Sequence, residues 1–205
     1  MACGGRLAFM NIMYSKKGPR CNYGPTNTYI VTSPIGDMEI LSCPKGLHNL
    51  HQVDTITDEN FYPEPGKQVI LLSQLYNDNG YTYKPALQCI DWLQAYFHPQ
   101  QSSSEPPTPP WCPSISREGT FTHTVWSTLQ SQIQFGNTIS YGRLARLCGN
   151  QKACRAVGQA MRTNPLQLLM PCHRVIQENG QLGNYSSGRR IKVKQWLLQH
   201  EGVIK

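Results

Sequence analysis

The sequence has no long uninterrupted apolar run. None of its hydrophobic stretches approaches the roughly 18 residues that a membrane-spanning helix needs, and the mean hydropathy is −0.44. No internal repeat is visible either. The 205 residues are enough for one large or two small globular domains with a sizeable core.

Residues 1–20 contain no acidic side chain, and their flanks do not make a secretory signal peptide. We expect this segment to be disordered, with a mitochondrial presequence as the alternative. The eight cysteines show no repeated spacing, and the chain is not a short secreted domain. We therefore expect free thiols in a reducing compartment rather than a disulfide framework.

Acidic residues become scarce in the second part of the chain. Residues 1–115 hold 7 Lys/Arg and 9 Asp/Glu, a net charge of −2, whereas residues 116–205 hold 12 Lys/Arg and 3 Asp/Glu, a net charge of +9. A Pro/Ser/Gln-rich stretch at 98–114 lies at this change and marks a domain boundary. The charge indicates an anionic partner for the second domain, nucleic acid first, with a solvated basic surface as the alternative.

The first domain, residues 21–112, is predicted to be a small antiparallel sheet with a helix. Residues 28–43 contain two β-branched or alternating runs around a Pro-Ile-Gly-Asp turn, which indicates a hairpin, and residues 46–53 are a candidate third strand. Residues 54–80 are expected to form a loop. A helix over 85–98 is predicted to face the sheet through residues three and four apart: Leu87, Ile90, Leu93, Gln94 and Phe97.

The second domain, residues 116–205, is predicted to be mostly helical, so the whole chain is α+β. Helical periodicity covers residues 123–133, and a further helix begins after Ser140 as N-cap and ends at Gly149. A short turn leads to another helix over 152–163, which completes a helix-turn-helix pattern. One face of that helix is basic or polar: Lys152, Arg155, Gln159 and Arg162. Such a stripe suits the phosphates and base edges of a DNA groove, and the small Ala156 and Gly158 would allow a close approach; a solvated polar face is the alternative.

One cysteine has neighbours that suit a nucleophile. The apolar, strand-like segment 166–170 delivers Cys172 directly before His173 and Arg174. Nearby positive charge lowers the pKa of a thiol and so favours the reactive thiolate. A nucleophile and its histidine base need a third group to orient the base, and Glu201, at the end of the final helix, is a candidate. The alternative for Glu201 is a solvated helix end.

Five segments in order resemble one family: FGNTISYGRLARLCGN, RAVGQAMRTNP, NPLQLLMPCHRV, GNYSSG and KQWLLQHEG. They are similar to the O6-alkylguanine-DNA alkyltransferases over residues 120–202, and TSPIGDMEILSCPKGLH and QCIDWLQAYFH resemble the first domain of the animal members. The resemblance implies direct-reversal repair of double-stranded DNA. The alkyl group of O6-alkylguanine, and less well of O4-alkylthymine, would pass irreversibly to a cysteine after base flipping. It further implies a monomer with no membrane association, working in the nucleus.

The resemblance also implies the role of individual residues. Cys172 would accept the alkyl group, activated through a water by His173 and Glu201, while Tyr141 would donate a proton to the guanine. Arg155 would fill the gap left by the flipped base. The remaining positions would brace the turn (Asn164), contact DNA (Lys152, Tyr141, Ala156, Gln159 and Arg162) or line the guanine pocket (Met161, Val175, Tyr185, Ser186 and Ser187).

Animal members of the family hold a structural zinc ion with two cysteines and two histidines, and the resemblance implies the same here. Cys21, Cys43 and His48 match by position. At the fourth position the chain has Cys112 instead of a histidine, which is a suitable tetrahedral ligand. His98, His51 and Cys89 are alternative fourth ligands, and unliganded cysteines are a further alternative.

The chain departs from the family pattern at the pocket. Residues 189–192, Arg-Arg-Ile-Lys, contain an expansion of about two residues, Ser187 stands where glycine is common, and Gln167 stands where many members have proline. Two other functions keep the same cysteine or the same fold. A Cys-His hydrolase would turn over repeatedly, and a non-catalytic alkylated-DNA binder or regulator would bind without reacting.

Overall fold

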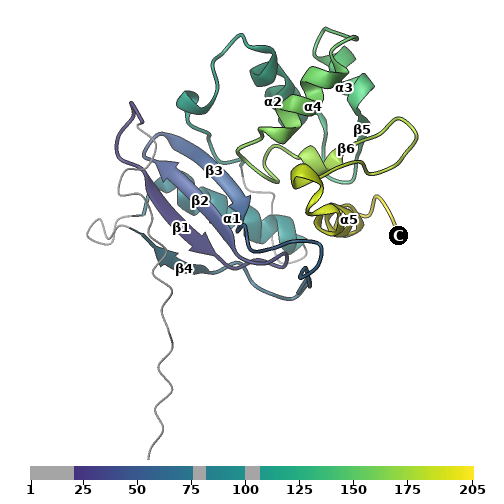
Figure 1. Ribbon diagram of the computed structural model, residues 1–205. Helices are drawn as coiled ribbons and strands as arrows, with labels where there is room; N and C mark the ends of the chain where they lie inside the picture. The colour runs from purple at the N-terminus through teal and green to yellow at the C-terminus, as the bar shows by residue number, and fades with distance from the viewer. Residues whose placement is uncertain (1–20, 76–81, 100–106) are drawn as a thin grey trace, which may run out of the picture.

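The structure of the chain is a computed structural model that describes residues 21–75, 82–99 and 107–205. The segment expected to be disordered, residues 1–20, lies outside the described residues. As predicted, the fold is α+β: a four-stranded antiparallel sheet covered by helix α1 comes first, and a mostly helical part follows (Figure 1). Among the described residues no helix is both long and apolar enough to cross a bilayer.

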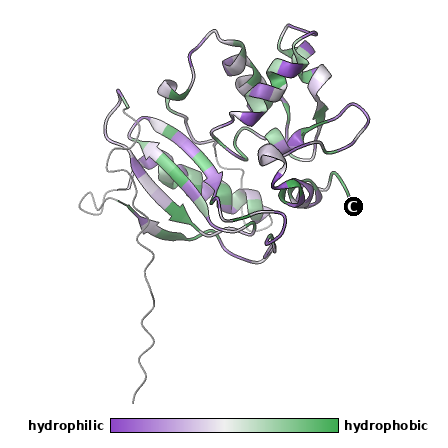
Figure 2. Cartoon of the chain, in the orientation of Figure 1, coloured by the Kyte–Doolittle hydropathy of each residue, from purple (hydrophilic) through white to green (hydrophobic). Residues whose placement is uncertain are grey.

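The sheet is built from a hairpin extended on both sides. β1 (Asn27–Val31) pairs with β2 (Met38–Cys43), and β2 pairs with β3 (Gly46–Gln52), as the sequence predicted. Burial alternates along β1, because one face of this strand packs on the core while the other is partly exposed. Figure 2 shows apolar and polar residues side by side on the strands of this sheet.

The prediction of a loop over residues 54–80 is wrong at residues 71–74, which form a strand. β4 (Leu71–Gln74) pairs with β1 and gives the strand order β3-β2-β1-β4. Its sequence does not alternate, and Leu71 and Leu72 are both exposed. A short edge strand without a buried face lacks the periodicity by which strands are recognised.

Helix α1 (Lys84–Phe97) lies on the sheet as predicted and buries Ile90, Leu93 and Phe97. Leu87 and Gln94 were expected on the same face, but Leu87 is 46% exposed and Gln94 is exposed as well. The buried stripe is completed by Ala86 and Cys89 instead, which moves its centre around the helix and leaves Leu87 on its margin.

The second part of the chain begins with α2 (Phe121–Gln132), α3 (Tyr141–Leu147) and α4 (Cys154–Arg162). Ser140 caps α3 by accepting a hydrogen bond from the backbone N–H of Arg143 at 3.2 Å, and Gly149 follows the helix with φ 81°, as a C′ glycine does. The Trp126 indole on α2 donates to the carbonyl of Ala160 at 2.8 Å and so fixes α4 against α2.

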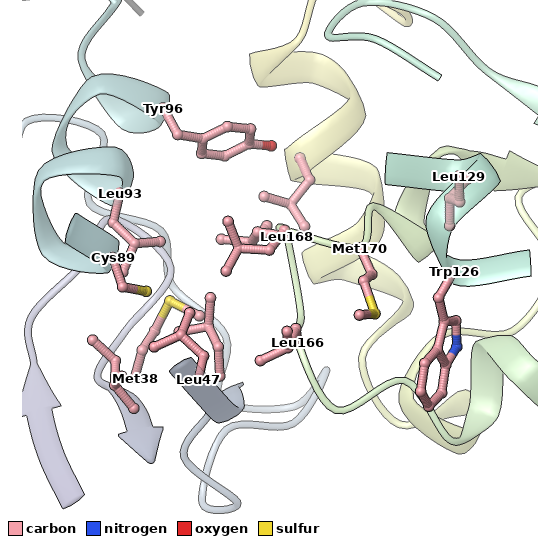
Figure 3. Packing of buried hydrophobic residues seen from close by; sticks show 14 of the residues in the cluster. Met38, Leu47, Cys89, Leu93, Tyr96, Trp126, Leu129, Leu166, Leu168 and Met170 are labelled. Carbon is pink, nitrogen blue, oxygen red and sulfur yellow. The ribbon is translucent and has the colours of Figure 1, made fainter. Parts of the chain in front are cut away.

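Residues 166–170, predicted to be strand-like, form a sequence of turns. Leu168 has φ 70°, and only Leu166 makes a bridge, to Leu50 of β3. The segment is apolar because it is buried from both sides: Figure 3 shows Leu166, Leu168 and Met170 between the sheet and α1 on one side and Trp126 of α2 on the other. A short, fully buried run does not reveal its secondary structure by periodicity.

Two 3-10 turns and a last helix complete the fold. The turns are η3 (Cys172–Arg174) and η4 (Ser186–Gly188), and the helix is α5 (Ile191–His200). η3 leads into β6 (Val175–Ile176), which pairs in parallel with β5 (Ile139–Ser140). A further turn, η2 (Pro113–Ile115), precedes α2.

The start of α5 is held by the first part of the chain. Asp58 accepts hydrogen bonds from the backbone N–H groups of Ile191 and Lys192 at 3.0 and 2.7 Å, so a distant carboxylate caps this helix. The buried Arg190 guanidinium donates to the carbonyls of Gln52 and Ile56 at 3.1 and 2.8 Å. The expanded segment 189–192 therefore joins the two parts of the molecule.

Candidate active site

Cys172 is the first residue of η3 and lies in the wall of a pocket of about 340 Å³. The other lining residues come from α3, from α4 and from the loop before α5: Tyr141, Gly158, Met161, Arg162, Gln177, Gly183, Asn184, Tyr185, Ser186 and Ser187. The volume falls in the range of small-molecule sites. The pocket therefore has room for a ligand the size of a nucleobase beside the thiol.

Glu201 is the centre of a buried polar network. Its Oε1 lies 2.7 Å from His173 Nε2 and accepts the Tyr96 hydroxyl at 2.7 Å, while Arg174 Nε donates to Oε2 at 2.9 Å. The Gly136 N–H also donates to Oε2 at 3.3 Å. Burial alone would raise the pKa of Glu201, but His173 and Arg174 outweigh it and lower the pKa to about 2. The carboxylate is therefore ionised, and Glu201 lies where an orienting group is needed.

His173 is fully buried, and burial lowers its pKa even though Glu201 acts in the opposite direction. A neutral imidazole whose Nε2–H donates to Glu201 presents Nδ1 as a proton acceptor. Among the described residues, Nδ1 has no hydrogen-bond partner. The Nδ1 atom is thus available as a base, either directly or through one water.

The expectation that positive neighbours lower the pKa of Cys172 is wrong. Burial raises the pKa of the thiol and outweighs a hydrogen bond from Asn164, the charge of Lys194 and a hydrogen bond from Tyr185. Arg174 does not act on the sulfur, because Glu201 occupies its guanidinium, and His173 is neutral. A protonated thiol needs a base during the reaction, which increases the importance of His173.

Tyr141 and Asn164 lie where their expected roles require. Tyr141, at the start of α3, lines the pocket, and burial together with the Cys172 charge raises its pKa, so the phenol keeps its proton. Asn164 donates to the carbonyl of Met170 at 2.7 Å and accepts from the N–H of Leu166 at 2.9 Å. These two bonds hold the turn that leads to Cys172.

The loop before α5 forms the outer wall of the pocket. Ser186 and Ser187 both line it, with φ 48° and 59°, in the left-handed region that non-glycine residues rarely adopt. Val175 does not line the pocket as expected. It is fully buried, because β6 pairs with β5, and its carbonyl accepts the Lys194 ammonium at 2.7 Å.

The polar side of α4 lies beside the pocket mouth, since Gly158, Met161 and Arg162 belong to both. The predicted DNA-contacting residues of α4 are all exposed: Arg155, Ala156, Gln159 and Arg162. Lys152 is exposed too, but it lies in the turn before α4, which begins at Cys154 and not at Lys152 as predicted. Arg162 donates to the Gln159 side chain at 2.7 Å. A duplex lying along α4 would therefore have the pocket beside it.

Sequence reasoning missed two polar residues of this site, Tyr96 and Lys194, and assigned Arg174 to the Cys172 thiol instead of Glu201. Tyr96 reaches Glu201 from α1 of the first part of the chain, and Arg174 pairs with the same carboxylate. Lys194 is fully buried and donates to the carbonyls of Val175 and Leu182; burial lowers its pKa to about 8. The available signal was a lysine next to Val193 on the apolar face of the last helix.

A second cluster lies away from the pocket. Cys21, Cys43, His48 and Cys112 place one ligand atom each within 4.8 Å of one another. The sulfurs of Cys21 and Cys112 are 3.6 Å apart, and the buried His48 Nε2 has no partner among the described residues. Tetrahedral zinc with Zn–S bonds of about 2.3 Å separates two sulfurs by roughly 3.8 Å. The donor set and its spacing therefore fit a zinc ion.

The alternative fourth ligands lie outside this cluster. His98 Nε2 lies 3.1 Å from the carbonyl oxygen of Lys67, and Cys89 of α1 is fully buried in the core. His51 is on β3 but does not belong to the group of four.

Comparison with known proteins gives consistent similarities. The family profile described as 6-O-methylguanine DNA methyltransferase, DNA binding domain, matches residues 120–203. The methylated-DNA–protein-cysteine methyltransferase of Rattus norvegicus is 39% identical over 174 residues, which is 85% of this chain and 81% of the rat protein. The Homo sapiens protein of the same name is 40% identical over 83% of this chain and 77% of its own length.

Solved structures agree with these relatives. Mycobacterium tuberculosis OGT in complex with DNA is 31% identical to this chain, with a TM-score of 0.57, and the alignment covers 84% of this chain and 90% of that protein.

Proposed function

The chain belongs to the methylated-DNA–protein-cysteine methyltransferases, and from this premise we propose that Cys172 is the cysteine that receives the alkyl group from O6-alkylguanine in DNA. The activity is direct-reversal DNA repair. The observation that carries the assignment to Cys172 is its position: the thiol lies in a base-sized pocket beside the basic helix α4, next to a buried His173–Glu201 pair.

The residues of the site can take up one proton and supply another during the transfer of the alkyl group. His173 Nδ1 takes the thiol proton as the Cys172 sulfur attacks the alkyl carbon, and the bond between that carbon and guanine O6 breaks. The electron pair moves into the guanine ring, which receives a proton from Tyr141. The net change is one thiol and one alkylguanine converted to one thioether and one guanine. Because a thioether is stable, each molecule reacts once.

The substrate base is proposed to leave the duplex before it reacts. An alkyl group inside a stacked helix is out of reach of a thiol in a pocket wall, so the nucleotide must rotate outwards. Arg155, exposed on α4 beside the pocket, is the side chain proposed to fill the vacated space. We propose that O4-alkylthymine reacts less well, and that the protein works as a monomer in the nucleus, where its substrate lies.

Intact-protein mass spectrometry tests the assignment of the acceptor. Incubation with duplex DNA that contains O6-methylguanine is expected to add one methyl group per chain, saturating at one, with the group on Cys172 after peptide mapping. Cys172→Ser is expected to abolish the gain. Cys154→Ser, which removes an exposed cysteine on the DNA-facing helix, is expected to retain it.

Other outcomes would contradict the proposal. Repeated turnover would indicate a hydrolase, binding without any gain in mass would indicate a non-catalytic binder, and a methyl group on another cysteine would move the acceptor.

We also propose that Cys21, Cys43, His48 and Cys112 hold one structural zinc ion. Three thiols and a buried imidazole without another partner are a donor set that zinc prefers. The ion would connect the residue before β1, the sheet and the segment that leads to α2.

The zinc proposal leads to a prediction for Cys112. Metal analysis of the purified protein is expected to find about one zinc per chain, and Cys112→Ser should lower that content and the unfolding temperature, because three ligands hold the ion less tightly. Alkyl transfer should be slower but still measurable, since no residue of the cluster lines the pocket. Cys154→Ser is the matched control and should keep its zinc. Full zinc content in Cys112→Ser would assign the fourth ligand elsewhere.

A further inference from the structure

The buried side chain of Gln167 lies between the sheet and the pocket loop. Its Oε1 accepts the backbone N–H of Gln52, the last residue of β3, at 2.9 Å. Its Nε2 donates to the hydroxyl of Tyr185 at 2.9 Å. A backbone N–H can only donate, so the oxygen of the Gln167 amide must face Gln52 and its NH₂ group must face Tyr185. The orientation of this amide is therefore unambiguous.

This orientation decides where the Tyr185 hydrogen points. The phenol oxygen accepts from Gln167, so its own O–H is free to donate to another group. Tyr185 is buried, lines the pocket together with Cys172 and, as a hydrogen-bond donor, lowers the pKa of the Cys172 thiol. The two bonds of the Gln167 side chain run in one direction, from the Gln52 backbone to Tyr185, and leave the phenol O–H to donate towards the sulfur. Donors aligned in such a chain strengthen one another.

The first member of the chain is itself fixed. The carbonyl of Gln52 accepts Arg190 Nη1 at 3.1 Å, while its N–H donates to Gln167. The sheet thus provides a fixed point for the chain of bonds, because β3 pairs with β2 along its whole length.

We infer that Gln167 is a positioning residue that holds the Tyr185 hydroxyl as a hydrogen-bond donor to the sulfur of Cys172. The inference rests on the proposed role of Cys172 as alkyl acceptor. A fixed donor stabilises the negative charge that develops on sulfur as His173 removes the proton, and it costs no reorganisation at that moment. The first part of the chain thereby contributes to the reactivity of the thiol without touching the substrate.

Other groups also act on this sulfur, and the test must leave them in place. The Asn164 side chain and the buried ammonium of Lys194 both favour the charged form of this sulfur. Tyr141 of α3 lines the same pocket, and the neutral His173 follows Cys172 in the chain. The test variants change Gln167 and Tyr185 alone.

Gln167→Glu reverses the bond to Tyr185 and removes the donor to sulfur. A carboxylate keeps the bond from the Gln52 N–H but has no N–H for Tyr185, so the phenol donates to the new carboxylate and no longer to sulfur. Tyr185→Phe removes the donor itself. Gln167→Met keeps the length of the side chain but lacks both polar atoms, and it carries no charge. Gln195→Glu, at an exposed glutamine of α5, is the matched control for an added carboxylate.

The measurement is the rate at which iodoacetamide alkylates Cys172 as a function of pH, followed by peptide mapping in the absence of DNA. The midpoint of this profile reports the thiol pKa. We expect the midpoint to rise by about one pH unit in Tyr185→Phe and in Gln167→Glu, and by less in Gln167→Met. The double variant Gln167→Glu/Tyr185→Phe should have the same midpoint as Tyr185→Phe alone, because the hydroxyl through which Gln167 acts is already absent. Gln195→Glu should match the unaltered protein.

Three results would overturn the inference. A lower unfolding temperature with an unchanged midpoint in both Gln167 variants would make Gln167 merely structural. An unchanged midpoint in Tyr185→Phe would mean that the hydroxyl does not act on sulfur. A Gln167→Glu effect that persists in full without the Tyr185 hydroxyl would come from the added charge. If instead the midpoints shift as expected but the unaltered protein transfers no methyl group from DNA, the proposed function fails and the positioning role stands.

Discussion

Glu201→Gln is expected to slow alkyl transfer by at least about a hundredfold, the usual contribution of a positioned base. The glutamine has nearly the same shape, but its NH₂ group opposes the side-chain donors that now converge on the carboxylate, from His173, Arg174 and Tyr96. His173 then loses the partner that keeps Nδ1 free to accept a proton. The rate should be measured under single-turnover conditions with O6-methylguanine DNA.

The same substitution should destabilise the fold. The Arg174 guanidinium would remain buried without its counter-ion, and breaking such a pair costs about 3 to 5 kcal/mol. Urea unfolding measures this loss. Glu178→Gln, which removes an exposed carboxylate from the same part of the chain, is the control and should change neither quantity. A folded Glu201→Gln protein with the normal transfer rate would contradict the role given to the network.

The effect should depend on pH. The pKa of Glu201 in the folded protein is about 2, below the ordinary 4.5. Its ionisation therefore stabilises the fold above about pH 4.5, and that contribution is lost as the pH falls towards 2. The difference in pKa corresponds to about 3 kcal/mol. We expect the stability gap between the unaltered protein and Glu201→Gln to narrow by about 1 kcal/mol between neutral pH and about pH 3.5.

Arg155→Ala is expected to separate two substrates. Filling the gap left by a flipped base offsets part of an unstacking cost of a few kcal/mol, so losing the side chain should slow repair of duplex DNA by about ten- to a hundredfold. Transfer from the free modified base needs no flipping and should change by less than about twofold, because Arg155 does not line the pocket. Parallel rates on the duplex and on free O6-methylguanine test this difference.

Lys152→Ala is the matched comparison, since Lys152 is an exposed cation just before the same helix. It should weaken DNA binding and reduce the salt dependence of binding by about one phosphate contact. The flipping step should be unaffected. Equal losses on duplex and free base in Arg155→Ala would mean that this residue supports the pocket and not the extrusion of the base.

The sequence correctly predicted the elements that have capping residues at their ends or β-branched, alternating residues along them. Ser140 and Gly149 bound α3 as caps do, and the β-branched runs around residues 33–37 give the β1–β2 hairpin. The segment 166–170 was misassigned, because apolar residues buried from two sides carry no period. β4 was missed because an exposed edge strand has no buried face.

The site was predictable only in part. The spacing around Cys172 indicated a nucleophile, yet the direction of its pKa depends on burial, which no local pattern reveals. Tyr96 could not be found, because its hydroxyl reaches Glu201 across 105 positions of sequence while its ring reads as one more apolar residue of α1. Gln167 likewise gains its meaning only from Gln52 and Tyr185.

The junction between the two parts of the molecule has a consequence for the order of folding. The contacts of Asp58 with Ile191, of Arg190 with Ile56 and of Tyr96 with Glu201 each join residues more than 100 positions apart. Closing such long loops costs chain entropy before the contact repays it, so these contacts form late. Until then Glu201 lacks the bond from Tyr96, and Gln167 lacks its bond to the Gln52 backbone. The complete set of hydrogen bonds around the thiol therefore forms only when both parts of the molecule have assembled.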